Sequence, residues 1–230
     1  MRLSTLSLIF VVALFLGSVP VQADSFVYST INFPGAFQTP AYGINDSGAI
    51  VGAYHYEYVN NNWQGFLFVG GSFTTLNVPG SIATTAYGIN DSGAIVGVYA
   101  GSSGGSCVQG CAFLDVGGNF TTINIPGSIW SYATGINDLG DIVGVYADAT
   151  GNSHGFLDVG GNLSTIDIPD AIANVAFGIN NSGDIVGMYG PGTAGTGSSG
   201  FLATPIPEPS TLALLGIGIV GLAGCKMRRS

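Results

Sequence analysis

Short apolar stretches separated by polar, glycine-rich turns recur along the chain and predict β-strands. The clearest stretch, Ile142–Tyr146, is apolar at nearly every position, so both faces of this strand should be covered. The residues 121–125 alternate, and Pro126, which has no N–H to donate, ends them. Outside the two ends of the chain no window shows a helical period. The middle of the protein is therefore predicted to be all-β.

The same pattern occurs four times. A Gly-Ile-Asn-x-x-Gly-x-Ile-Val-Gly segment begins at Gly43, Gly88, Gly135 and Gly178, at spacings of 45, 47 and 43 residues. A Phe-Leu pair and a Thr-Thr-x-Asn-x-Pro segment accompany each copy. We expect four-stranded units at about 26–70, 71–117, 118–160 and 161–203. A repeat of this period predicts a small four-bladed β-propeller, and a β-solenoid or another stack of β-sheets is the alternative.

The two ends look like targeting segments. Arg2 precedes an apolar run and the small-residue pattern at 21–23, which predicts a signal peptide over 1–23, cleaved after Ala23. The repeat domain then covers 24–204. Residues 205–230 contain Pro207, Glu208 and Pro209, an uncharged stretch at 211–225 and a basic end. Fifteen helical residues span only about 22 Å, so this stretch predicts a marginal membrane helix, with a permanent short anchor as the alternative.

This three-part tail resembles the PEP-CTERM sorting signal of Gram-negative bacteria that produce exopolysaccharide. The resemblance implies transient anchoring in the inner membrane, an exosortase-type partner that recognises Pro207–Pro209, and a final place at the cell surface or outside the cell. The repeats resemble the extracellular HAF-repeat family, from which they depart because only His154 keeps the histidine of the His-Ala-Phe triplet. That family carries no agreed activity to transfer.

The distribution of charged residues restricts the functions that the protein can have. All four basic residues lie at the ends, Arg2, Lys226, Arg228 and Arg229, and the whole chain has a net charge of −9. Between residues 24 and 206 there are eleven Asp, one Glu and no Lys or Arg. Such a surface repels phosphate backbones, which excludes nucleic acid as a partner, and no catalysis in this region can use a basic residue other than histidine.

Three sets of residues are candidates for chemistry. The Asn-Asp turns predict either ordinary turn structure or a Ca²⁺ site, the only cofactor the sequence suggests; the residues are Asn45, Asp46, Asn90, Asp91, Asn137, Asp138, Asp141 and Asp184. Aromatic residues at Tyr54, Tyr56, Tyr58 and Trp63 predict either strand packing or a platform for sugar rings. Cys107 and Cys111 are predicted to form a disulfide, since exported proteins meet an oxidising compartment.

No catalytic residues are predicted, because the two histidines lie far apart in sequence and no nucleophile or metal motif accompanies them. The leading hypothesis is an exported, non-enzymatic binding or structural module associated with exopolysaccharide or biofilm. The alternative is a secreted glycosidase-like enzyme that uses a pair of carboxylates such as Asp138 and Asp141.

Overall fold

The computed structural model describes residues 28–56, 62–102, 107–191 and 197–206. The chain divides into two compact units, Met1–Thr30 and Ile31–Ser230, and every strand lies in the second. The predicted signal peptide, Tyr58, the Pro-Glu-Pro residues and the predicted helix at 211–225 lie outside the described residues. Within the described residues all regular structure is β, as the sequence predicts, and none of them forms a helix that could span a membrane.

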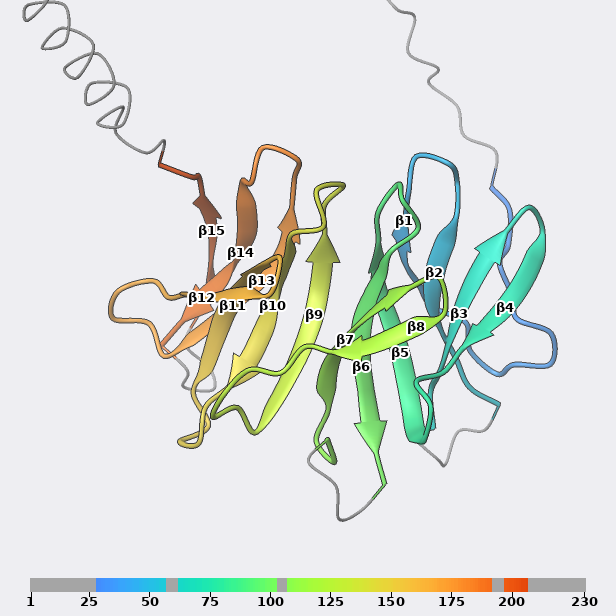
Figure 1. The fold of residues 1–230 in the computed structure, drawn as a ribbon, viewed down its shortest axis with the longest axis horizontal. Helices are drawn as coiled ribbons and strands as arrows, with labels where there is room; N and C mark the ends of the chain where they lie inside the picture. The colour runs from blue at the N-terminus through green and yellow to red at the C-terminus, as the bar shows by residue number, and fades with distance from the viewer. Residues whose placement is uncertain (1–27, 57–61, 103–106, 192–196, 207–230) are drawn as a thin grey trace, which may run out of the picture. The chain divides into compact units, whose positions relative to one another are not determined.

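Four antiparallel meanders, one per repeat, follow one another along the molecule and form three sheets (Figure 1). Repeat 1 contains β1 (Ala41–Ile44), β2 (Ile50–Tyr54), β3 (Gln64–Val69) and β4 (Ser72–Leu76). Repeat 2 contains β5 (Ser81–Ile89), β6 (Ile95–Gly101), β7 (Cys111–Val116) and β8 (Asn119–Thr122). Repeat 3 contains β9 (Trp130–Ile136), β10 (Ile142–Ala147), β11 (Ser153–Val159) and β12 (Asn162–Ile166). Repeat 4 contains β13 (Ala173–Ile179), β14 (Ile185–Gly190) and β15 (Ser199–Ala203).

Each repeat is a simple meander in which consecutive strands pair, and one parallel bridge, Ser153 to Ala173, joins repeats 3 and 4 into a seven-stranded sheet. The strands are grouped in a different phase from the predicted units. In those units the Thr-Thr-x-Asn strand comes first, whereas β4, β8 and β12 pair with the strand before them and close each repeat. The reason is the Gly-Gly pair, for example Gly70-Gly71 at φ +57° and +86°, which makes a two-residue hairpin turn rather than a boundary.

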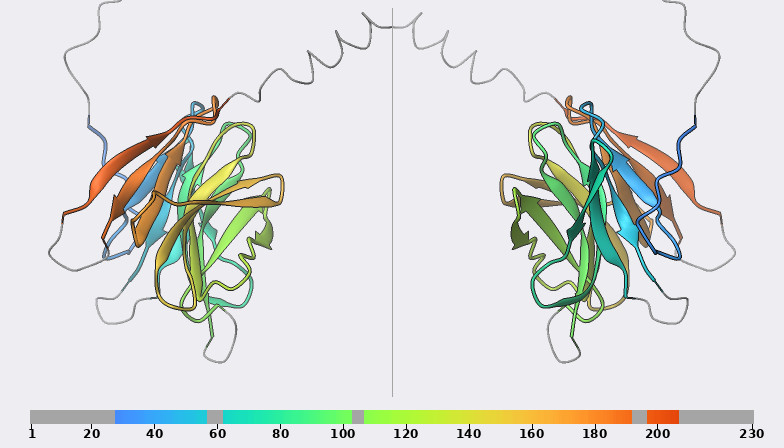
Figure 2. Two further views of the ribbon diagram at one scale, coloured as in Figure 1. Left: turned by 90° about the vertical axis from the view of Figure 1, so that its left-hand side faces the viewer. Right: turned by 90° about the vertical axis from the view of Figure 1, so that its right-hand side faces the viewer.

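The main contacts between repeats connect each repeat with the next along the chain, for example β2 with β5, β6 with β9 and β10 with β13. Between repeats, the described residues show stacked sheets and no closed propeller ring. The core is accordingly three clusters, one at each junction between repeats. The turn between the first and second strand of each repeat lies at the same edge of the molecule in both views of Figure 2.

A β-bulge shapes the first strand of every repeat. In repeat 3 the register shifts between Ala133 and Gly135, so Thr134 is the extra residue, opposite the stretch from Val143 to Gly144. A Cβ on Gly144 would lie 2.0 Å from the Tyr132 carbonyl oxygen and 2.5 Å from the Phe156 ring. The glycine thus lets a bulged strand and a buried aromatic ring close on the same backbone. Gly52, Gly97 and Gly187 have equivalent surroundings.

Replacing Gly144 with Ala should therefore cost about 3 kcal/mol, because the added methyl group overlaps backbone that cannot move aside cheaply. In a domain of this size that corresponds to a melting temperature lower by roughly 6–12 °C, measurable by circular dichroism. Gly197→Ala is the control, since a Cβ there meets nothing within 4 Å. Equal melting temperatures for the two variants would contradict the bulge.

Candidate functional site: an aromatic groove lined by all four repeats

The bulges place one residue of each repeat at the wall of a shared groove. These bulged residues are Tyr42, Tyr87, Thr134 and Phe177, one from the first strand of each repeat. They line a groove of about 390 Å³ together with Tyr132, Val145 and Val175. Bulges are a common means of redirecting a side chain toward a site. The four repeats therefore converge on one largely apolar groove whose polar side-chain groups are three tyrosine hydroxyls and one threonine hydroxyl.

The aromatic rings of the groove are arranged at angles to one another. Tyr42 and Tyr87 lie 5.2 Å apart between ring centroids, with their planes at 57°. Tyr42 and Phe177 are each 50% exposed, so ring faces remain open to a ligand. Burial raises the pKa of Tyr42, and burial followed by the nearby Tyr42 and Tyr132 raises the pKa of Tyr87. Both hydroxyls consequently stay protonated and able to donate hydrogen bonds at neutral pH.

The predicted sugar platform does not form as a single surface. Tyr54 and Tyr56 both contact Phe33, whereas His55 contacts Trp63. Tyr54, however, is only 2% exposed, stacked on Phe33 with ring centroids 3.6 Å apart and bonded through its hydroxyl to Gln64 and Thr75. Its ring is used in packing, and Trp63 lies on the opposite face. Of the described members of this set, Tyr56, 52% exposed, keeps an open surface on the tyrosine side.

The Asn-Asp turns are the second predicted site, and the structure uses them to join neighbouring repeats. The Asn90 side chain accepts the Ala94 amide at 2.9 Å and donates to the Asn137 carbonyl at 3.0 Å. Asn45 and Asn137 make the same bond to the next repeat, to the carbonyls of Asn90 and Asn180. We call this series the asparagine ladder. It is buried in the middle of the molecule, where Asn90 and Asn137 are 5% and 4% exposed.

A second row of bonds runs beside the asparagine ladder. The amides of Asp46 and Asp91 each donate to the carboxylate of the aspartate in the next repeat, Asp91 and Asp138, at 2.8 Å. The Asp138 backbone amide donates in turn to the side-chain oxygen of Asn181. The Asp91 amide and then the Asn181 side chain lower the pKa of Asp138. The carboxylates therefore cap backbone amides.

Asp141 and Asp184, the remaining predicted ligands, bond the side-chain amides of Asn137 and Asn180 in their own turns. Among the described residues no three His, Cys, Asp or Glu side chains are grouped to share a cation. Hydrogen bonds within and between the turns engage the side-chain oxygen atoms that recur in the repeats. The Ca²⁺ site stays a prediction.

The disulfide between Cys107 and Cys111 is present in the structure, as predicted, with the Tyr99 hydroxyl 3.2 Å from Cys107 Sγ. It closes the edge of a loop in repeat 2. Tyr99 also bonds Thr122, and the same Tyr–Thr bond joins the second and fourth strands in repeats 1 and 3.

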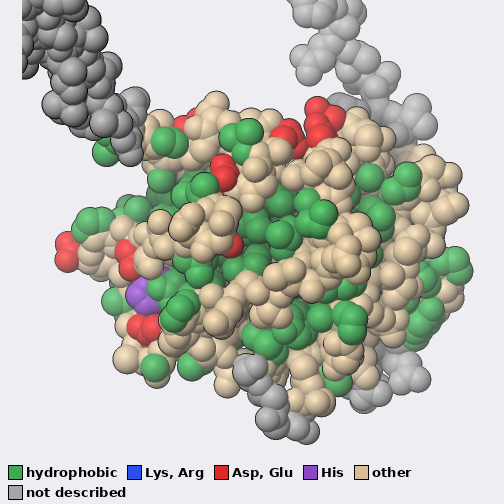
Figure 3. All heavy atoms as spheres, in the orientation of Figure 1, with side chains coloured by type: hydrophobic (Ala, Val, Ile, Leu, Met, Phe, Trp, Pro, Cys, Tyr) green, Lys and Arg blue, Asp and Glu red, His purple; other side chains and the backbone are tan. Residues whose placement is uncertain are grey.

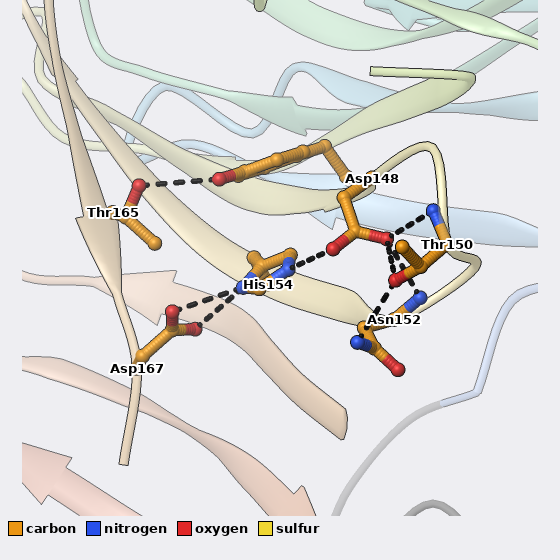
Figure 4. A network of polar contacts seen from close by, with 7 residues as sticks. Asp148, Thr150, Asn152, His154, Thr165 and Asp167 are labelled. Atoms are coloured by element: carbon orange, nitrogen blue, oxygen red, sulfur yellow. Dashed lines mark hydrogen bonds and ion pairs between the residues drawn. The ribbon is translucent and has the colours of Figure 1, made fainter. Parts of the chain in front are cut away.

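A polar cluster around His154 was not predicted (Figure 4). Its Nδ1 lies 2.9 Å from Asp167 and its Nε2 3.1 Å from Asp148, which also accepts bonds from the Thr150 amide and hydroxyl. Burial acts to lower the pKa of His154, but the hydrogen bonds to Asp167 and Asp148 outweigh it and raise the pKa. The Thr150 hydroxyl, then His154, lower the pKa of Asp148.

One sequence signal could have found this cluster: Asp167 stands where the other repeats have Asn32, Asn77 and Asn124, and His154 stands where repeat 1 has Gln64. Figure 4 shows the two carboxylates on opposite sides of the imidazole ring, each at a different nitrogen. Because both nitrogens are engaged, the arrangement suits a clamp between the β10–β11 hairpin and the end of β12.

Comparison with known families identifies the C-terminal tail. Residues 205–229 match the PEP-CTERM protein-sorting motif, which implies an exported protein sorted by an exosortase. No curated protein matches the chain. The resemblance of the repeats to HAF repeats stays a prediction.

The calcium alternative can be tested by melting the protein with EDTA and with 1 mM CaCl₂. Because the asparagine and aspartate oxygens already accept backbone and side-chain N–H groups, we expect the two melting temperatures to agree within error. A calcium-dependent rise of several degrees, lost in Asp138→Ala but kept in Asp158→Ala, would establish a cation site instead.

The His154 clamp predicts a pH-dependent stability. The raised pKa of His154 means that its contribution is fully present below pH 6.5 and is lost as pH rises through the raised value. The lowered pKa of Asp148 means that its contribution falls away only in strong acid. The melting-temperature difference between wild type and His154→Gln should therefore be larger at pH 5.5 than at pH 9. In an Asp167→Asn background, the effect of His154→Gln on the melting temperature should depend less on pH. An effect of His154→Gln that is the same at both pH values would contradict the clamp.

Proposed function

We propose that this exported protein is a non-enzymatic module of the cell surface or extracellular matrix that binds a polysaccharide in the aromatic groove. The observation that carries the proposal is the groove itself, to which all four repeats contribute a residue at a bulge. In this proposal the repeats act as propeller-like blades whose first strands form the binding wall.

The composition of the groove supports a sugar ligand. Aromatic rings present flat apolar faces on which the C–H faces of sugar rings pack, and the tyrosine hydroxyls supply hydrogen bonds at the edges. The three tyrosines come from three different strands, β1, β5 and β9. A ligand that follows them would contact several repeats at once, as a chain of sugar units does.

Charge supports a neutral polysaccharide. The protein has no Lys or Arg between its two end segments, so a polyanion would meet only repulsion. On the face shown in Figure 3, acidic side chains lie at the upper edge and at the left, and hydrophobic side chains occupy the middle. An exopolysaccharide of the producing cell is the ligand class this combination favours, and a role in biofilm follows from it.

Affinity electrophoresis through gels containing neutral or anionic polysaccharides tests the proposal. We expect retardation by at least one neutral polysaccharide, without release of sugar products, and a loss of at least tenfold in affinity for Tyr87→Ala combined with Tyr132→Ala. Tyr56→Ala is the control, because this tyrosine is 52% exposed and lies outside the groove. Products formed during incubation would favour the glycosidase alternative, and retardation unchanged by the double substitution would exclude the groove.

A further inference from the structure

The three junctions between repeats are built from one pair of complementary faces. The outgoing face of a repeat presents a valine from its second strand and a leucine from its third, such as Val51 and Leu67. The incoming face of the next repeat presents an alanine and isoleucine from its first strand, such as Ala86 and Ile89. The same arrangement recurs at the next two junctions, with Val96 and Val143 outgoing and with Ala133 and Ala176 incoming.

The two end repeats expose the same faces. Val51, Val96 and Val143 are 0% exposed, whereas their equivalent in repeat 4, Val186, is 49% exposed. Leu202, the outgoing leucine of repeat 4, is 67% exposed. On the incoming side of repeat 1, Ile44 is 66% exposed, whereas Ile89 is 8% exposed. Large apolar side chains left open in a cluster mark a surface for another protein.

The polar groups at the two ends also match the groups that meet at the junctions between repeats. The Asn137 side-chain amide donates both to Asp141 in its own turn and to the Asn180 carbonyl of the next repeat. Asn180 makes the first of these bonds, to Asp184, and its side-chain amide carries a second N–H for a following repeat. Repeat 1 begins the ladder with the Asn45 carbonyl and the Asp46 carboxylate, the same groups that Asn90 and Asp91 offer to repeat 1.

Close backbone approach gives a third match. A Cβ on Gly43 would lie 3.3 Å from Gly88 Cα, one on Gly88 3.4 Å from Gly135 Cα, and one on Gly135 3.2 Å from Gly178 Cα. The first strands thus approach one another through glycines at every junction. Gly178 and Gly43 bring the same small surface to the two ends of the series.

We propose that repeat 4 of one copy binds repeat 1 of a second copy, in the geometry that joins consecutive repeats within the chain. The partner is a second copy because the same interface already occurs at three junctions within the chain. In addition, a single chain exposes both complementary faces of that interface, one on repeat 1 and one on repeat 4. Such a head-to-tail contact gives a closed ring when the rotation between copies closes and a filament when it does not. The contact does not depend on ligand binding in the groove.

The charge of the protein adds a condition. Each copy has a net charge of −9, so association is opposed by repulsion that salt screens. Assembly should therefore strengthen between 20 and 300 mM NaCl, as an apolar contact between like-charged molecules does.

Cross-linking tests the register directly. In the full chain, kept in mild detergent, Asp46→Cys with Asn181→Cys places thiols at the proposed contact between copies, and Asp46→Cys with Asp91→Cys places them at an existing junction as a positive control. With mild oxidation we expect the first pair to give covalent dimers and larger species and the control to give cross-linked monomer. A cross-linked monomer from the first pair would show that the chain closes on itself, and no cross-link beside a working control would show no contact; either result overturns the proposal.

Light scattering of wild type and variants provides the second test. Val186→Asp and Ile44→Asp should each lower the association constant at least tenfold, because each buries a charge in the apolar contact. Val116→Asp is the matched control, since Val116 is 54% exposed and lies at the end of β7. A monomer at every concentration and salt, or an oligomer indifferent to Val186→Asp and Ile44→Asp, would overturn the proposal.

Discussion

The structure depends on the hydrogen bonds made by the asparagine side chain at the first turn of each repeat. Asn90 bonds its own turn through Ala94 and the next repeat through the Asn137 carbonyl, so one residue fixes both the hairpin and the position of its neighbour. These bonds are buried in the middle of the chain, where an unpaired amide or carbonyl would cost about 1–3 kcal/mol. A sheet whose turn is held in this way can only stack in one register.

That register determines the groove. Once the turns are aligned, the first strands of the four repeats lie next to one another, and the bulge in each strand directs a side chain to the same side. The glycines at the junctions allow the close approach, since a Cβ added to Gly135 would lie only 3.2 Å from Gly178 Cα. Thus the same small set of residues joins the repeats, shapes the wall and leaves matching faces at the two ends.

Sequence patterns predicted the strands and the tight turns because both follow from local rules. In the Asn-Asp turns, for example, Gly93 and Gly140 have φ values of +81° and +86°, which glycine adopts without strain. The strands are grouped in a different phase from the predicted units, since a Gly-Gly pair is compatible with a unit boundary and with a hairpin turn. The sequence left strand packing and a sugar platform open for Tyr54, because the alternation of residues along a strand carries no information on depth; the structure buries Tyr54 against Phe33.

The groove is harder to predict from the sequence than the strands and turns are. Tyr42, Tyr87 and Phe177 precede a glycine in the repeat, but their common direction depends on a one-residue shift in pairing with the second strand. The Asp148–His154–Asp167 cluster similarly joins a hairpin turn to the end of β12, and only the pairing of β11 with β12 brings these residues together.

Equilibrium unfolding of Asn90→Ala, beside Asn162→Ala, tests the central role of the ladder most directly. Asn90 is buried and bonded across a junction, whereas Asn162 is exposed and bonds only the Val159 carbonyl of its own hairpin. We predict a loss of about 2–4 kcal/mol for Asn90→Ala, because the Ala94 amide and Asn137 carbonyl lose their partner, and less than about 0.5 kcal/mol for Asn162→Ala. Equal small losses for the two variants would contradict the account.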